Sequence, residues 1–267
     1  MKKKHVYHSK ELDSLGHASY SDEENETWSF LLNRQKELID SRASKEFIKG
    51  LELLNFPQKI PQHDEVTSVL NKHTGWGVEP VPALIQPEHF FSLLANKRFP
   101  AANFIRIPEE IDYIQEPDVF HEFFGHCPLL TNSAYAEFMN EYGKLALVAD
   151  AKTKIRLFRL FWFTIEFGLI REDMQFKAYG GGILSSKSEV IYSTESEIPE
   201  RHLLDPLNAL RTPFRIDILQ PVYFVIESYE DLFKLLEKKP LQLALESMSM
   251  PDFPAKFPTK KRFKKND

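Results

Sequence analysis

The sequence predicts a mainly α (α+β) fold, in which packed helices and a few short strands form a single domain. Apolar residues recur at helical spacing through the first part of the chain, whereas short β-rich runs occur mainly in its later part. No internal repeat and no linker divides the 267 residues, and the hydrophobic content of 42% is sufficient for one large core.

Three helices are expected near the start of the chain. In residues 21–39, Ser21 and Glu24 have the spacing of a capping box, and apolar residues then recur at helical intervals. Residues 45–56 and 63–75 show two more helical patterns, separated by a segment that contains two prolines. Residues 1–19 are polar, and we expect them to form a flexible N-terminal segment.

The central part of the chain alternates between loops and helices. Five prolines between residues 80 and 108 exclude one long helix, so we expect loops and short strands around a helix near residues 87–97. Helices are predicted again at residues 118–125, 133–149 and 153–170. The last of these is apolar on every side, which is typical of a helix buried in the middle of a fold.

The later part of the chain is expected to contain strands. Residues 178–193 hold three consecutive glycines followed by a β-rich run, and residues 214–228 resemble strands. A closing helix is predicted at residues 229–238. Residues 251–267 form a basic tail, which we expect to be a solvated end.

The composition excludes several classes of protein. A net charge of −5 is too small to indicate nucleic acid or an anionic membrane as the main partner. The single Cys127 rules out an intramolecular disulfide, and no apolar signal segment follows the positively charged start, so a cytoplasmic protein is expected. The most hydrophobic stretch, residues 155–170, contains Arg159 and Glu166 and is too short to span a bilayer.

Two histidines in the segment HEFFGH suggest a metal site. His121 and His126 are five residues apart, and five residues turn an ideal helix by about 500°, which leaves the two side chains about 140° apart. We therefore expect Gly125 to end the helix in a left-handed conformation and to swing His126 back, with Pro128 preventing the helix from resuming. The alternative is that the two histidines are only packed and hydrogen-bonded in an aromatic segment.

A third ligand is suggested by Glu166, the only acid in an aromatic stretch of the chain. A buried carboxylate must be neutralised, paired or bound to a metal, and Arg159 and Arg171 do not have the spacing of a helical ion pair with it. Two imidazoles and one carboxylate form the facial triad typical of non-haem Fe(II) and O₂. Glu122 is free for contacts with a cofactor.

These segments, together with HTGW, FIRIP and AYGGGILSS, resemble the pterin-dependent aromatic amino acid hydroxylases. The resemblance covers residues 20–229 in consistent order. It implies a catalytic domain over residues 20–250, with Fe(II) held in a central pocket by His121, His126 and Glu166. It also implies a second cofactor, tetrahydrobiopterin or a related tetrahydropterin.

The resemblance assigns residues to the cofactor and to the substrate. Those on the pterin side are Val81, Ala83, Leu84, Ile85, Phe90, Glu122 and Phe161. Arg106 would bind the carboxylate of an amino acid through charge-assisted hydrogen bonds. Those around the substrate ring and backbone are Trp162, Phe167, Gly182 and Ser185. By residue type alone, Arg106 would be placed in a surface salt bridge and the two aromatic residues in the core.

Two departures from the family pattern bear on the pterin side of the site, and two further residues bear on the choice of substrate. The family usually has tyrosine where Phe161 stands and a small residue where Phe158 stands. Trp162 and Ile216 together favour phenylalanine as the substrate. The resemblance therefore implies an oxidoreductase with the activity of a phenylalanine 4-monooxygenase, which converts L-phenylalanine into L-tyrosine with O₂ and a tetrahydropterin in phenylalanine catabolism.

The sequence also indicates the assembly of the protein and leaves alternative functions open. The chain shows no N-terminal regulatory domain and no C-terminal heptad helix, so it resembles the short bacterial form, and a monomer is expected. The alternatives are a hydroxylase of tryptophan, a zinc-dependent hydrolase with Glu122 as general base, and a non-catalytic module that binds an amino acid.

Overall fold

The structure is a computed structural model that describes residues 6–82 and 84–258. It begins with three helices at the predicted places: α1 (Asp22–Ile39), α2 (Lys45–Leu54) and α3 (His63–Thr74). The capping box of α1 is present, because Ser21 Oγ accepts from the backbone N–H of Glu24 and Glu24 Oε2 accepts from the backbone N–H of Ser21. Its apolar face carries the fully buried Trp28 into the core.

A small sheet and a helix follow α3. Strands β1 (Gly77–Val81) and β2 (Arg98–Ala102) pair in parallel, and α4 (Pro87–Ala95) connects them. Pro87 stands at the start of α4, where its missing N–H costs no helical hydrogen bond. The helix predicted near residues 87–97 is therefore confirmed. A short 3₁₀ turn, η1 (Pro108–Glu110), leads toward the centre of the molecule.

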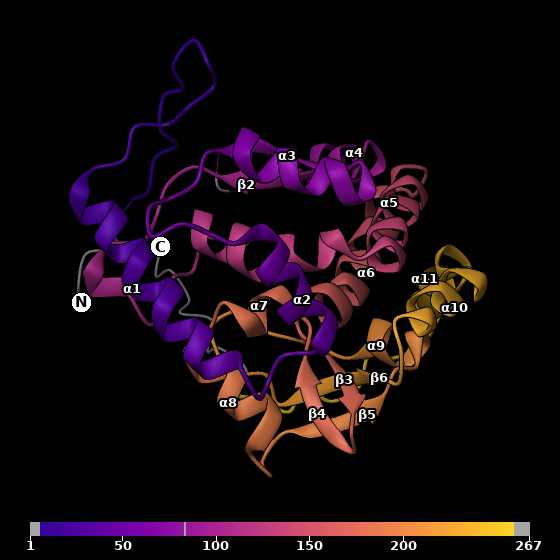
Figure 1. Ribbon diagram of the computed structural model, residues 1–267. Helices are drawn as coiled ribbons and strands as arrows, with labels where there is room; N and C mark the ends of the chain where they lie inside the picture. Colours follow the sequence, from indigo (N-terminus) through magenta and orange to yellow (C-terminus); the bar gives the residue numbers. More distant parts are fainter. Residues whose placement is uncertain (1–5, 83, 259–267) are drawn as a thin grey trace, which may run out of the picture.

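The centre of the fold contains two π-helical turns. The first, η2 (His121–His126), continues into the 3₁₀ turn η3 (Cys127–Thr131) and then into α5 (Ser133–Leu147). The second, η4 (Trp162–Glu166), follows α6 (Ala151–Phe161). Figure 1 shows α5 and α6 on one side of the molecule, with the four-stranded sheet below them.

The predicted single helix over residues 153–170 is wrong only at its end, because α6 and η4 keep the chain helical as far as Glu166. After α6 and η4 the chain enters β3 (Gly168–Glu172), because the backbone of β3 pairs with two other strands. The helix is also not buried on every side, since Ile155 is 65% exposed. Only one face of α6 contributes to the core.

The larger sheet has the order β4-β3-β6-β5. Strands β3 and β4 (Gln175–Ala178) form an antiparallel hairpin, whereas β6 (Val222–Ile226) runs parallel to both β3 and β5 (Glu200–Leu203). All residues of β6 are buried, so this strand is covered on both faces, as expected for the interior of a parallel sheet.

The β-rich run expected after the three glycines is helical instead. It forms α7 (Gly181–Leu184) and α8 (Lys187–Glu195). Ser186 caps α8, since its hydroxyl accepts from the backbone N–H of Glu189 at 3.3 Å, and burial of Val190 fixes the inner face. Capping and packing thus override the strand propensity of this segment. In residues 214–228, only β6 is a strand.

The chain ends with α9 (Pro206–Arg211), α10 (Glu230–Glu237) and α11 (Pro240–Ser249). The closing helix predicted at residues 229–238 is confirmed by α10, whereas α11 is not predicted. The mainly α (α+β) fold with a few short strands is also confirmed. No helix among residues 6–82 and 84–258 is long and apolar enough to cross a membrane.

The N-terminal segment makes defined contacts where it is described. Tyr7 donates to Glu110 at 2.6 Å and stacks on Phe104, and both Ser9 and the backbone of Lys10 donate to Asn103 Oδ1. The division into residues 1–19, 20–250 and 251–267 stays a prediction. Residues 1–5 of the first segment and 259–267 of the predicted tail lie outside the described residues.

Candidate metal centre

The three predicted metal ligands meet at one point. The Nε2 atoms of His121 and His126 lie 3.2 Å apart. The carboxylate of Glu166 approaches them at 3.3 Å from His126 Nε2 and 3.7 Å from His121 Nε2. Their ligand atoms all lie within 4.8 Å of one another, which is the spacing of three donors around one ion.

The way in which the chain brings the two histidines together differs from the prediction. Gly125 does not end the helix in a left-handed conformation, because among the described glycines only Gly16 and Gly75 have positive φ. Instead His121 and His126 are the first and last residues of η2, a π-helical turn. A π-helix bonds residue i to i+5, so its wider turn places residues five apart on the same side.

Glu166 reaches the site through the second π-helical turn. The backbone N–H of Phe167 donates to the carbonyl of Trp162 at 2.8 Å, a separation of five residues. The two arginines considered as partners for Glu166 are engaged elsewhere: Arg159 pairs with Asp252, and Arg171 pairs with Glu227. Since the arginine pairings do not occur, the histidines are the groups that face the Glu166 carboxylate.

Ser185 fixes the proton of His121. The Ser185 hydroxyl donates to the carbonyl of Gly181 at 2.9 Å, so its oxygen accepts the hydrogen bond from His121 Nδ1, also at 2.9 Å. His121 therefore carries its proton on Nδ1, and the lone pair of Nε2 faces the other two ligands. A second hydrogen bond of this kind orients most metal-binding imidazoles in proteins.

The run of three glycines lies against the ligands. A Cβ atom on Gly181 would lie 2.4–2.5 Å from the imidazole of His126, and one on Gly180 would lie 2.3 Å from the carbonyl oxygen of Glu166. A Cβ atom on Gly125 would in turn lie 2.7 Å from the carbonyl oxygen of Gly181, so position 125 has no room for a side chain. The sequence predicts a role only for Gly182 among the three glycines, because the close approach of distant backbone is not visible in the sequence.

The charge states of His121 and Glu166 suit a metal. Burial lowers the pKa of His121 to about 4, against the opposing attraction of Glu166. Burial raises the pKa of Glu166, but the attraction and hydrogen bond of His126 and the charge of His121 outweigh it and lower the pKa to about 2. At neutral pH the site thus offers a neutral His121 and a charged carboxylate, the forms that bind cations.

Arg106 is buried, which excludes the surface salt bridge considered from residue type. Its Nε and Nη2 each donate to a carboxylate oxygen of the fully buried Asp118 at 2.8 Å. The same carboxylate accepts from the backbone N–H of His121 at 3.0 Å. One edge of the guanidinium is thus occupied by Asp118.

The residues predicted around the substrate ring lie in η4 and α7 or directly after them: Trp162 begins η4, Phe167 follows it, Gly182 lies in α7 and Ser185 follows α7. The indole of Trp162 stacks on the ring of Phe167 at 4.4 Å between centroids, and both side chains are partly exposed. A Cβ atom on Gly182 would lie 2.8 Å from the Phe167 ring, so glycine allows this aromatic residue to approach α7. Ser185 holds His121, as described above.

Two of the residues predicted on the pterin side, Phe90 and Phe161, form an aromatic group with Phe158. The ring of Phe90 lies 5.3 Å from that of Phe161 and 5.5 Å from that of Phe158. Glu122 is buried, and burial followed by the charges of Glu166 and Asp118 raises its pKa well above the usual range. Val81 ends β1, and Leu84 and Ile85 follow it, whereas Ala83 lies outside the described residues.

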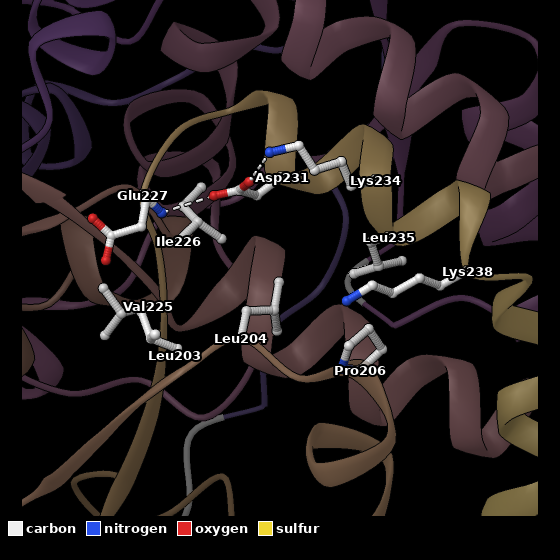
Figure 2. Close-up of a pocket in the computed structure, with 10 residues that line it drawn as sticks. All are labelled: Leu203, Leu204, Pro206, Val225, Ile226, Glu227, Asp231, Lys234, Leu235 and Lys238. Atoms are coloured by element: carbon white, nitrogen blue, oxygen red, sulfur yellow. Dashed lines mark hydrogen bonds and ion pairs between the residues drawn. The ribbon is translucent and has the colours of Figure 1, made fainter.

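A separate surface pocket of about 190 Å³ lies between the ends of β5 and β6 and helix α10. Figure 2 shows Asp231 inside it, held by the backbone N–H of Glu227 and by Lys234. Its lining residues include Leu203, Val225 and Lys238 but none of the predicted site residues. We therefore do not assign this pocket to the metal centre.

Comparisons with known proteins agree with the geometry. Residues 2–246 match the model of the biopterin-dependent aromatic amino acid hydroxylases. The phenylalanine-4-hydroxylase of Pseudomonas aeruginosa is 49% identical over 255 residues, which cover 94% of this chain and 97% of that protein. The chain therefore belongs to the biopterin-dependent aromatic amino acid hydroxylase family, as the resemblance implied.

Two solved structures show the same fold. The cold-active phenylalanine hydroxylase of Colwellia psychrerythraea, in its apo form, superposes with a TM-score of 0.92 at 46% identity, covering 96% of this chain and 99% of that one. The phenylalanine hydroxylase of Chromobacterium violaceum with bound oxidised Fe(III) gives a TM-score of 0.86 at 40% identity, covering 91% and 89%. Membership of this family decides against the zinc hydrolase and the non-catalytic module.

Proposed function

We propose that this protein is a phenylalanine 4-monooxygenase, which converts L-phenylalanine into L-tyrosine with O₂ and a tetrahydropterin at a non-haem Fe(II) centre. The observation that carries the proposal is the convergence of His121, His126 and Glu166 in a member of a pterin-dependent family. The names of its relatives, among them those of Pseudomonas aeruginosa and Colwellia psychrerythraea, support phenylalanine as the substrate.

The three ligand residues fit iron by their chemistry. Two imidazoles and one carboxylate are the donor set of non-haem Fe(II) oxygenases, and they leave coordination positions open for other ligands. The fit is supported by the Ser185 hydrogen bond, which holds the His121 lone pair toward the other donors. When bound, iron together with a reduced pterin supplies the activation of O₂.

The remaining site residues bind and orient the reactants. Arg106 is held by Asp118 and would fix the amino acid through its carboxylate, while Trp162 and Phe167 pack against the ring. The pterin would lie against Phe90 and Phe161, with the residues of 81–85 along its edge. Holding both reactants in an aromatic, water-poor site converts binding energy into correct placement.

Glu122 has a different role from that of a metal ligand. It is buried directly beside His121 but is not one of the three residues whose ligand atoms converge. With its raised pKa it is suited to hydrogen bonding with the ring nitrogens of a pterin, because a neutral carboxyl both donates and accepts. We therefore keep it among the cofactor-binding residues of the proposal.

The proposal also covers the assembly and the compartment of the protein. We propose a monomer that acts in the cytoplasm, with residues 20–250 as the catalytic domain. Light scattering of the purified protein tests the monomer, and a concentration-independent mass of about twice the chain mass of 31.1 kDa would contradict it.

The function is tested by following tyrosine formation from phenylalanine with added Fe(II) and a tetrahydropterin. A chelated sample and a sample without pterin serve as controls, and tryptophan competes as the alternative substrate. We expect tyrosine only in the complete mixture. Iron-loaded protein that yields 5-hydroxytryptophan in preference to tyrosine would replace phenylalanine by tryptophan, and iron-loaded protein that yields neither would refute the proposal.

A further inference from the structure

The indole of Trp162 is fixed on both faces. Phe167 stacks on it at 4.4 Å with an angle of 28° between the planes, and Phe214 stacks on it at 4.4 Å with an angle of 19°. Phe214 belongs to the loop between α9 and β6, about fifty residues further along the chain. The position of Trp162 thus depends on a loop outside the segments that carry the metal ligands.

The only polar atom of the indole is bound to the same loop. Trp162 Nε1 donates to Gln220 Oε1 at 3.2 Å, and Gln220 is 1% exposed. The other end of this side chain donates to the carbonyls of Arg215 and Ile218 at 2.7 and 3.0 Å. Since two carbonyls face the amide nitrogen, a flipped amide would lose all three bonds, and the oxygen must face Trp162.

The backbone of Gln220 is fixed from a third direction. Its N–H donates to Glu189 Oε1 at 3.0 Å, and the same oxygen accepts from the hydroxyl of Tyr223. Glu189 lies in α8 and Tyr223 in β6, and both are buried. Gln220 is therefore bound simultaneously to α8, to its own loop and to the Trp162 ring.

We propose that Gln220 is a positioning residue, which fixes the plane of Trp162 and the 214–220 loop together and thereby sets the selectivity of the site for a phenyl ring over an indole ring. This inference rests on the proposed function, in which the substrate ring packs against Trp162. A buried amide with three partners holds an aromatic wall more rigidly than stacking alone, because hydrogen bonds fix direction whereas stacked rings can slide.

The test compares Gln220→Leu with the wild-type protein, loaded with Fe(II) and supplied with a tetrahydropterin. The readouts are kcat/KM for phenylalanine and for tryptophan, and the affinity for each amino acid from calorimetry. Gln220→Leu is expected to lower the preference for phenylalanine about tenfold, which corresponds to about 1.4 kcal/mol. The change should lie mainly in KM, because the metal ligands do not contact Gln220. Gln220→Met, which is unbranched, replaces the leucine variant if that variant does not fold.

Asn140→Leu is the matched control for a general loss of stability. Asn140 is also buried, and its amide nitrogen also donates to two carbonyls, those of Leu94 and Ala95. This variant is expected to lose stability without a change in preference. An equal loss of preference in both variants would overturn the inference.

A double-mutant cycle with Trp162→Phe shows whether Gln220 acts through the indole. Phenylalanine at position 162 has no N–H donor, so adding Gln220→Leu should change the preference by no more than about twofold in that background. Equal effects in both backgrounds would refute positioning through Trp162. Failure of the proposed function gives a different result. If the iron-loaded wild-type protein shows no turnover, but the calorimetric preference for phenylalanine is still lower in Gln220→Leu than in the wild-type protein, the monooxygenase is refuted and the positioning role is supported.

Discussion

The Nε2 atoms of His121 and His126 lie 3.2 Å apart because the two residues are the ends of one π-helical turn. Glu166 ends a second turn of the same type. π-Helical turns are rare in proteins, and those that do occur are often found at functional sites. In this protein each turn replaces the regular spacing of an α-helix with one that helps to bring His121, His126 and Glu166 together.

The contact between Gly181 and His126 predicts the effect of a single methyl group. Gly181→Ala should lower the affinity for Fe(II) by about 10- to 100-fold, because its Cβ would collide with the imidazole and displace one ligand. Anaerobic Fe(II) titration measures the change. Gly75→Ala is the control: Gly75 has φ of 75° and open space around a Cβ, so strain without a change in iron affinity is expected. Unchanged affinity in Gly181→Ala would refute the contact.

The hydrogen bond from His121 to Ser185 predicts a similar loss by a different route. Ser185→Ala removes the acceptor for the Nδ1 proton, so the imidazole is free to rotate and to change tautomer, and iron affinity should fall about tenfold or more. Ser193→Ala removes another fully buried hydroxyl, one that bonds only within α8, and should leave iron affinity unchanged. Equal affinities in the two variants would contradict the role of Ser185.

The buried ion pair between Arg106 and Asp118 predicts a large stability effect. Asp118→Asn leaves the Arg106 charge uncompensated in the core and replaces one of the two carboxylate oxygens that accept from Arg106 by an NH₂ donor, so unfolding free energy should fall by about 3–5 kcal/mol. Denaturant unfolding measures it. Glu141→Gln breaks the exposed pair with Lys144 and should cost less than about 1 kcal/mol. A comparably small cost in Asp118→Asn would contradict this account.

Glu189 predicts a dependence of stability on pH. Burial raises its pKa to about 7, although the hydrogen bonds from Tyr223 and from the backbone of Gln220 oppose the shift. Between the unperturbed pKa of 4.5 and about 7 the folded state binds the proton more tightly than the unfolded state, so rising pH lowers the stability. The wild-type protein should therefore lose stability relative to Glu189→Gln between pH 5 and pH 8 (roughly the titration range of the shifted carboxyl). If the free energies of unfolding of the two proteins change in parallel with pH across this range, Glu189 titrates normally and the prediction is wrong.

The chemistry of the site could be predicted from the sequence, but its backbone could not. His121, His126 and Glu166 are conspicuous because imidazoles and a lone acid stand among aromatic residues. The five-residue spacing predicts a broken helix at Gly125, since local sequence does not distinguish a π-helical turn from a helix end. In the folded chain η2 packs against α7, where a Cβ on Gly125 would lie 2.7 Å from the carbonyl oxygen of Gly181, and this contact between distant segments is not visible in the local sequence.

Contacts between distant segments account for the other differences. The strand propensity of residues 190–192 gave a wrong expectation for α8, whose cap at Ser186 and buried Glu189 decide the conformation. Gln220 was not identified at all, because its partner Trp162 is 58 residues away and a lone glutamine carries no pattern. Such partners emerge only once the chain is folded.

The most direct test of the metal centre is the stoichiometry and affinity of Fe(II) binding in the wild-type protein and in Glu166→Gln. Glu189→Gln, which alters a buried carboxylate outside the triad, is the control. The account predicts one Fe(II) per wild-type and control chain, with binding sharply weakened in Glu166→Gln while its circular dichroism stays native. Near-native iron affinity in folded Glu166→Gln would remove this residue from the metal centre and contradict the account.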